Sequence, residues 1–257
     1  MPAERAYIRL VNPVDTVPLM LFALHLLALG VGMVMFFGML ILHRRARALA
    51  QTAQADHTLF SADSRFVRHP TVWLAIHSSN SRAVQNALGV GYPAPCPWAE
   101  GIAGGHDFFI GSPVNEWIIV TGSGLPHPGK DVDRCYHFLI LLSRVLGQVQ
   151  FFMADPVLHH HAWVRVENGT VTRAYAWVNE TLWNQGAKSI AEIELNMKCF
   201  SYGENAGMDD ATMAEYAAAN VKKIPSLSAR WSFDPINVNL SLQHPAPGVA
   251  GKSSRPW

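Results

Sequence analysis

Histidines are the residues of this sequence whose chemistry stands out first. Three consecutive ones, His159 to His161, offer imidazole nitrogens, the commonest protein ligands of transition metals. Alternate residues of a strand face the same way, so only His159 and His161 could share an ion. The spacing selects no further ligands, for which Asp155, His137 and His106 are candidates. The simpler interpretation is a polar strand end whose imidazoles form hydrogen bonds, and we predict no metal site.

A second group of residues could support nucleophilic catalysis, because a cysteine lies close to histidines and aspartates. The group comprises His127, Asp131, Asp133, Cys135 and His137. On a helix that begins at Asp131, Cys135 and His137 are two positions apart and point in different directions. The segment GSG at 122–124 also departs from the GxSxG nucleophile elbow, and no Walker loop, GxGxxG or HExxH motif is present. We therefore predict no catalytic residues and no enzymatic activity.

A long apolar stretch near the N-terminus predicts one transmembrane helix. Leu19 to Leu42 is apolar apart from His25. At about 1.5 Å per residue it exceeds the roughly 30 Å hydrocarbon core of a bilayer, and it is too long for a secretory signal. Three arginines follow closely, so the positive-inside rule places the domain after the span in the cytoplasm. We expect a single-pass membrane protein whose C-terminal domain is cytoplasmic.

His25 is the position in this helix that predicts a specific contact. Imidazole is costly inside a bilayer, which makes an intramembrane histidine a functional hypothesis by default. His25, Ala28 and Gly32 share one helical stripe, and the small residues allow another helix or a flat ring to approach closely. The first interpretation is a helix-packing face with His25 hydrogen-bonded across it. The alternatives are an axial ligand of (bacterio)chlorophyll or haem, and snorkelling toward the interface.

Composition narrows the remaining function classes. The 257 residues carry 20 basic and 19 acidic side chains for a net charge of +1, which argues against a nucleic-acid partner. Cys96, Cys135 and Cys199 show no CxxC or CxxCH spacing, so they indicate no disulfide framework, zinc knuckle or attached haem. Reduced thiols in a cytoplasmic domain fit this pattern best, and we expect no cofactor of the chain's own beyond the possible pigment contact at His25.

The chain divides into five predicted segments. Asp15 or Thr16 can cap the membrane helix, and polar helix formers continue it beyond Leu42. The tail is rich in proline and glycine without a periodic face, so alone in water it should be disordered. The segments are an interfacial N-terminal stretch (1–16), a transmembrane helix (17–43), a juxtamembrane helix and linker (44–70), a soluble domain (71–235) and an extended tail (236–257).

Within the soluble domain, short apolar runs between turn residues predict an α+β fold with a largely antiparallel sheet and a few helices. Asn168-Gly169 tolerates the positive φ values of a tight turn and predicts a hairpin, and residues 107–111 and 116–122 predict another. Asp131 or Asp133 can cap the clearest helix, which Gly147 ends. The other predicted elements are a strand at 71–76, helices at 81–88 and 209–221, and a loop at 89–105.

Tryptophan is abundant, with eight residues in the chain. Tryptophan concentrates in cores and in the anchors of protein interfaces. Those in predicted strands are expected in the core. Trp98, Trp183 and Trp257 lie in predicted loops or in the tail, and we predict that they are interface residues.

The segment LFALHLLALGVGMVMFFG, residues 21–38, resembles the single-span accessory subunit of the reaction-centre and light-harvesting photosystem of Gemmatimonas-type phototrophic bacteria. In the soluble part, CPWAEG, RAYAWV and TLWNQG look like pieces of a bacterial family, and this likeness implies no particular activity. The resemblance implies a structural role, in which the subunit braces the reaction centre against its antenna ring and adds no redox centre.

These observations together predict a non-catalytic, membrane-anchored accessory subunit of a large bioenergetic membrane complex. On the resemblance, the complex is a photosynthetic reaction-centre and light-harvesting complex whose assembly the subunit stabilises. Its partners are then the reaction-centre and antenna polypeptides and the lipid bilayer of the bacterial inner membrane. A membrane-tethered enzyme and a tethered module that recruits a partner of unknown identity are the alternatives.

Overall fold

Strands dominate the part of the chain that the computed structural model describes, residues 70–204, 209–235 and 246–254. These residues belong to one unit that spans 66–257. The predicted membrane helix at 17–43 and the segments that flank it, up to residue 69, lie outside the described residues. Among the residues described, no helix is both long enough and apolar enough to cross a bilayer.

The described strands form a nine-stranded sheet in which every neighbouring pair is antiparallel. Their order across the sheet is β2-β9-β3-β4-β1-β5-β6-β7-β8. This confirms the predicted α+β fold with a largely antiparallel sheet. The strands are β1 (Val72–His77), β2 (Val90–Cys96), β3 (Phe108–Ile110), β4 (Trp117–Thr121), β5 (Gln148–Ala154), β6 (His161–Glu167), β7 (Thr170–Trp177), β8 (Thr181–Gln185) and β9 (Gly248–Ser253).

The central strand β1 is buried on both faces, because its consecutive apolar side chains point in turn to one face and then to the other. Leu74 and Ile76 face one core, whereas Trp73 and Ala75 face the other, and all four are fully buried. A strand with two buried faces requires a covering layer on each side of the sheet. The described domain accordingly has helices on both faces.

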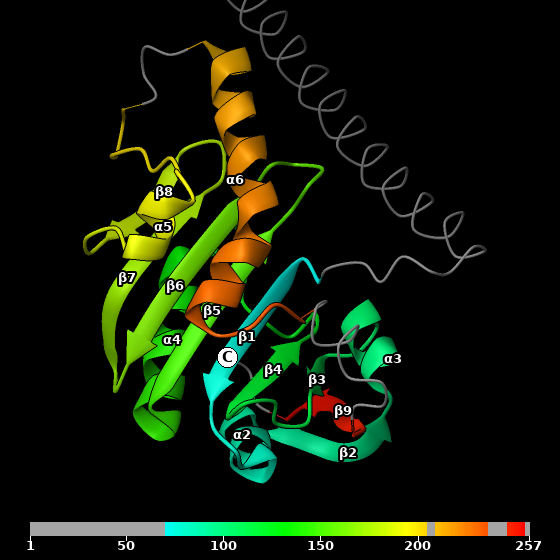
Figure 1. The fold of residues 1–257 in the computed structure, drawn as a ribbon. Coiled ribbons are helices and arrows are strands. Elements are labelled where there is room, and N and C mark those ends of the chain that lie inside the picture. Colours follow the sequence, from blue (N-terminus) through cyan, green and yellow to red (C-terminus); the bar gives the residue numbers. More distant parts are fainter. Residues whose placement is uncertain (1–69, 205–208, 236–245, 255–257) are drawn as a thin grey trace, which may run out of the picture. The chain divides into compact units, whose positions relative to one another are not determined.

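The helices divide between the two cores. On one face, α2 (Ser81–Leu88) and α4 (Val132–Leu146) bury residues such as Leu88 and Leu139. On the other face lie α3 (Trp98–Ala103), α5 (Ile190–Glu194) and α6 (Asp210–Trp231). In Figure 1, α6 crosses the sheet over β5 and β6, and α4 lies behind the same strands.

Two local predictions are confirmed by turn and cap geometry. Asn168 and Gly169 have φ values of 47° and 81° and connect β6 to β7 as a hairpin. Asp131 caps α4 by accepting a hydrogen bond from Arg134 N at 2.8 Å. The hairpin of β3 and β4 also forms as predicted.

Three expectations differ from the structure. The predicted loop at 89–105 contains β2 and α3, and β2 tolerates Pro93 and Pro95 because it is the last strand of the described sheet. The last helix does not stop before Pro225 but continues to Trp231, since residues on both sides of the proline are packed on the sheet. Part of the predicted tail forms β9, which pairs with β2 and β3.

Candidate functional site

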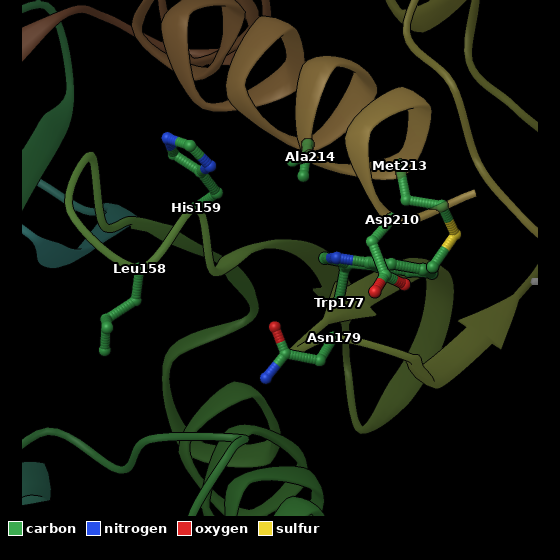
Figure 2. A pocket seen from close by; sticks show the side chains of 8 residues that line it. Leu158, His159, Trp177, Asn179, Asp210, Met213 and Ala214 are labelled. Atoms are coloured by element: carbon green, nitrogen blue, oxygen red, sulfur yellow. The ribbon is translucent and has the colours of Figure 1, made fainter. Parts of the chain in front are cut away.

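A pocket of about 320 Å³ opens where α6 faces the end of β7 and the connection between β5 and β6. Figure 2 shows Asp210, Met213 and Ala214 projecting from α6, with Trp177 and Asn179 from the end of β7. Leu158 and His159 form the opposite rim, and Ala217 completes the lining.

The rim of the pocket is formed by a tight turn between β5 and β6. The carboxylate of Asp155 accepts hydrogen bonds from the backbone N–H groups of Val157 and Leu158, both at 2.9 Å. These bonds fix a turn in which Val157 is 77% exposed and Leu158 57% exposed. The hydrogen-bonded turn therefore exposes two aliphatic side chains to solvent at fixed positions.

The same turn corrects the interpretation of the three histidines. The strand begins at His161, and His159 lies before it with a φ of 55°, so the two do not alternate along one strand as predicted. His159 lines the pocket, whereas His161 is 1% exposed. Burial lowers the pKa of His160, and this effect outweighs the opposing effect of the Asp155 charge. The three imidazoles therefore occupy different surroundings.

His161 supports the pocket from behind. Its Nδ1 donates to the carbonyl of His159 at 3.0 Å, and its Nε2 accepts from Asn220 Nδ2 at 3.1 Å. The amide of Asn220 is itself oriented by the backbone N–H and C=O of Lys198. Burial lowers the pKa of His161 to about 4, so the ring is neutral and links α6 to the rim.

The pocket combines an apolar wall with a few polar groups. Trp177 and Met213 supply the wall, and Asn179 and Asp210 supply an amide and a carboxylate. Asp209 is the N-cap of α6, since its carboxylate accepts from Thr212 N at 2.9 Å. The neighbouring Asp210 is thus placed in the first turn of the helix, where its side chain lines the pocket. Sequence reasoning missed this pocket, because nothing in the spacing links residues 158, 177 and 210.

No protein family, characterised protein or solved structure shows significant similarity to this chain.

A buried ion pair occupies the same face of the sheet, beyond the pocket. Arg173 Nη2 lies 2.8 Å from Glu192 Oε1, and the two side chains are 4% and 0% exposed. The carboxylate of Glu192 also accepts from Trp163 Nε1 and from the backbone N–H of Ser189, both at 2.8 Å. Burial alone would raise the pKa of Glu192, but these donors and the charge of Arg173 lower it overall.

The guanidinium of Arg173 connects two segments that stood out in the sequence. Arg173 begins RAYAWV, and its Nη1 reaches three groups of TLWNQG, namely Asn184 Oδ1 and the carbonyls of Gln185 and Gly186. Its Nη2 donates to Cys199 Sγ at 3.2 Å. These contacts connect β7 to β8 and to the segment that contains Cys199.

Cys135 and His137 lie in different surroundings on α4. Cys135 is buried in the core, and burial followed by the charge of Asp131 raises its pKa to about 12. His137, two positions along α4, is exposed, as expected from the helical spacing. Burial raises the pKa of Cys199 to about 11. Both thiols are therefore held in the protonated, weakly nucleophilic form.

The predicted interface tryptophans correspond to buried side chains where the structure describes them. Trp98 is 3% exposed and packs edge-on against Phe109, and Trp183 is 7% exposed and contacts Tyr136. The sequence pattern predicts loops at both positions, but they lie in α3 and β8. Trp257 lies outside the described residues, as do His25, Ala28 and Gly32.

One trio among the described residues has donor atoms close enough to hold a metal ion. Cys96 Sγ, a Glu100 carboxylate oxygen and a His106 ring nitrogen all lie within 4.8 Å of one another. Cys96 is buried at the end of β2, and burial followed by the charge of Glu100 raises its pKa. This trio lies in the half of the sheet that contains β2, whereas the pocket lies in the half that contains β7.

Proposed function

We propose that this chain is a non-catalytic, membrane-anchored accessory subunit of a large bioenergetic membrane complex. The apolar stretch Leu19 to Leu42 supports the anchor. The resemblance of residues 21–38 makes a photosynthetic reaction-centre and light-harvesting complex the expected assembly. The extramembrane domain contributes by docking against a neighbouring subunit through the pocket between α6 and the turn from β5 to β6.

The observation that carries this proposal is that the exposed carboxylate of Asp210 and the ring of Trp177 line the same pocket. An exposed carboxylate at an apolar pocket favours a cationic side chain, because the charge can accept a charge-assisted hydrogen bond while the aliphatic part of that side chain packs on the pocket wall. The pocket is therefore suited to an arginine or lysine of the partner.

Membrane proteins place such side chains at a predictable location. Their cytoplasmic loops carry an excess of lysine and arginine, which is the side of the bilayer on which we expect this domain. The exposed Val157 and Leu158 extend the rim with apolar surface. A basic loop of a neighbouring membrane subunit is therefore the proposed occupant.

A matched pair of substitutions tests this proposal. Asp210 and Asp133 are both exposed aspartates in the first turn of a helix, but only Asp210 lines the pocket. Asp210→Asn removes the charge and should lower the affinity for the partner roughly tenfold, as for a lost charged hydrogen bond. Asp133→Asn should leave it unchanged.

The measurement is the amount of membrane polypeptide that co-purifies with each full-length variant from mildly solubilised membranes, quantified by mass spectrometry. A selective loss with Asp210→Asn supports the proposal. Equal recovery of the same polypeptides with Asp210→Asn and with Asp133→Asn would show that the pocket does not hold the partner.

A further inference from the structure

Three side chains of different chemistry converge at the junction of β2, α3 and the segment before β3, which lie together in Figure 1. Cys96 Sγ lies 3.6 Å from His106 Nε2, and Glu100 Oε1 lies 3.7 Å from the same nitrogen. Cys96 is buried, whereas the Glu100 and His106 side chains are 62% and 29% exposed. The cluster thus has a fixed inner donor and an outer side open to solvent.

Cys96 and Glu100 are positioned by the packing of α3. Cys96 ends β2, where it pairs with Gly248 of β9, and Glu100 lies in the first turn of α3. The helix is fixed by buried Trp98 and by Thr121 Oγ1, which donates to the carbonyl of Gly101 at 3.0 Å. The two donors therefore belong to a packed part of the domain.

His106 is held by the segment GSG, which does not form a nucleophile elbow. The backbone N–H of Ser123 donates to the carbonyl of His106 at 3.0 Å, and that of Gly124 donates to Asp107 at 2.8 Å. Gly122 has a φ of 134°, and a Cβ there would overlap the carbonyl oxygen of Asp107. Glycine at 122 therefore permits the backbone of GSG to contact the carbonyls of His106 and Asp107. This contact holds His106 near the start of α3.

The distance between the sulfur of Cys96 and the ring nitrogen of His106 matches an edge of a metal coordination tetrahedron. Tetrahedral Zn²⁺ with a bond of about 2.3 Å to sulfur and about 2.0 Å to nitrogen separates these ligand atoms by about 3.5 Å. The Cys96–His106 distance is 3.6 Å, close to that value. A Cys-His-Glu relay would instead need contacts to both ring nitrogens, whereas here both contacts reach Nε2.

We propose that Cys96, Glu100 and His106 bind a divalent transition-metal ion, with Zn²⁺ as the preferred ion and a fourth position open to water or an external ligand. A thiolate, an imidazole and a carboxylate suit Zn²⁺, whereas Mg²⁺ and Ca²⁺ require oxygen donors. On binding, the thiol proton of Cys96 passes to solvent and sulfur bonds to the metal. The ion ties α3 to the segment before β3. The spacing of four and six residues matches no zinc knuckle, so the sequence did not predict this site.

Cobalt titration of the full-length chain tests this site directly. The protein is purified in detergent without a polyhistidine tag, freed of metal with a chelator and titrated with Co²⁺. We expect one equivalent to bind with visible d–d bands and a near-ultraviolet thiolate-to-cobalt band, and Zn²⁺ to displace it. Cys96→Ser and His106→Gln should each weaken binding by about a hundredfold or more, and Glu100→Gln by about tenfold.

Control variants separate this site from other donors of the chain. His137→Gln removes an exposed histidine beside Cys135 and should leave the titration unchanged. Glu100 is largely exposed, so Glu100→Gln keeps the test valid if substitution of buried Cys96 disturbs folding, which circular dichroism monitors. Absence of a thiolate-to-cobalt band in the wild-type chain overturns the proposal. A band of the same affinity in both Glu100→Gln and His106→Gln also overturns it.

Discussion

The guanidinium of Arg173 and the carboxylate of Glu192 form an ion pair that is almost completely buried, with 2.8 Å between Nη2 and Oε1. Burying two charges is costly, but Trp163 and Ser189 satisfy further lone pairs of the carboxylate. Removal of one partner would leave the other charge buried and uncompensated. The stability of the domain therefore depends on both residues together.

Glu192→Gln is expected to lower the free energy of unfolding by about 3 to 5 kcal/mol, because Arg173 would then be buried without its counter-ion. Glu194, two residues along α5, pairs with Arg230 at the surface, where both side chains are partly exposed. Glu194→Gln should therefore cost no more than about 1 kcal/mol. Urea unfolding of the full-length variants in detergent measures both values. Equal destabilisation by the two substitutions would contradict the structural role of the buried pair.

Acid should destabilise the domain through His161. Burial lowers the pKa of His161 to about 4, whereas an unfolded histidine titrates near 6.5. Between these values the unfolded chain binds the extra proton, so stability falls as the pH falls from about 6.5 to 4, by on the order of 3 kcal/mol. The lowered pKa of Glu192 acts in the same direction at still lower pH, where the carboxylate becomes protonated.

His161→Gln tests the source of this acid sensitivity, because glutamine can donate and accept hydrogen bonds but does not titrate. The variant should show a shallower decline in unfolding free energy between pH 7 and pH 4 than the wild-type chain. Exposed His137→Gln should retain the wild-type slope. An unchanged slope in His161→Gln would assign the acid sensitivity to other groups.

Gly169→Val should weaken the hairpin of β6 and β7. Gly169 has a φ of 81°, and a Cβ there would lie 2.6 Å from Arg144 Cγ. A β-branched residue at positive φ should cost on the order of 1 kcal/mol or more. Gly169→Asn should cost less, since asparagine tolerates this conformation. Thermal unfolding of the full-length chain compares the two substitutions, and the same melting temperature for both variants would contradict the turn geometry.

Sequence patterns predicted the elements whose signals are local. Asn168-Gly169 specified a turn, and Asp131 with Gly147 marked both ends of α4. By contrast, β9 consists mainly of small residues, and its identity as a strand comes from pairing with β2 and β3, which are more than a hundred residues away in sequence. Local propensity contains no information about such partners.

The pocket could not be predicted for a related reason, because it gathers residues from three separate segments that only the completed fold brings together. The cluster of Cys96, Glu100 and His106 lies within one short stretch of sequence, but its spacing matches no zinc motif. Pro225 misled the prediction of α6, because the rule that proline ends helices was overridden by burial of Ile224 and Leu227 against the sheet.

The proposed membrane anchor leads to a prediction about residues outside the described part of the chain. If His25, Ala28 and Gly32 form a packing face, Gly32→Leu should displace the subunit from its complex without impairing membrane insertion. His25→Ala should weaken assembly, and it should remove a pigment absorption feature only if His25 is a ligand. Normal recovery of the complex with both substitutions combined would show that the helix serves only as a tether.

Membership of a larger membrane assembly is the central claim about this chain. The most direct measurement is purification of the wild-type chain from its native membranes in a mild detergent, followed by native mass spectrometry of the particle that contains it. We predict a particle in which the chain is present in a fixed ratio to other membrane polypeptides. Recovery of the chain alone, at its own mass and without a stoichiometric partner, would contradict the proposed function.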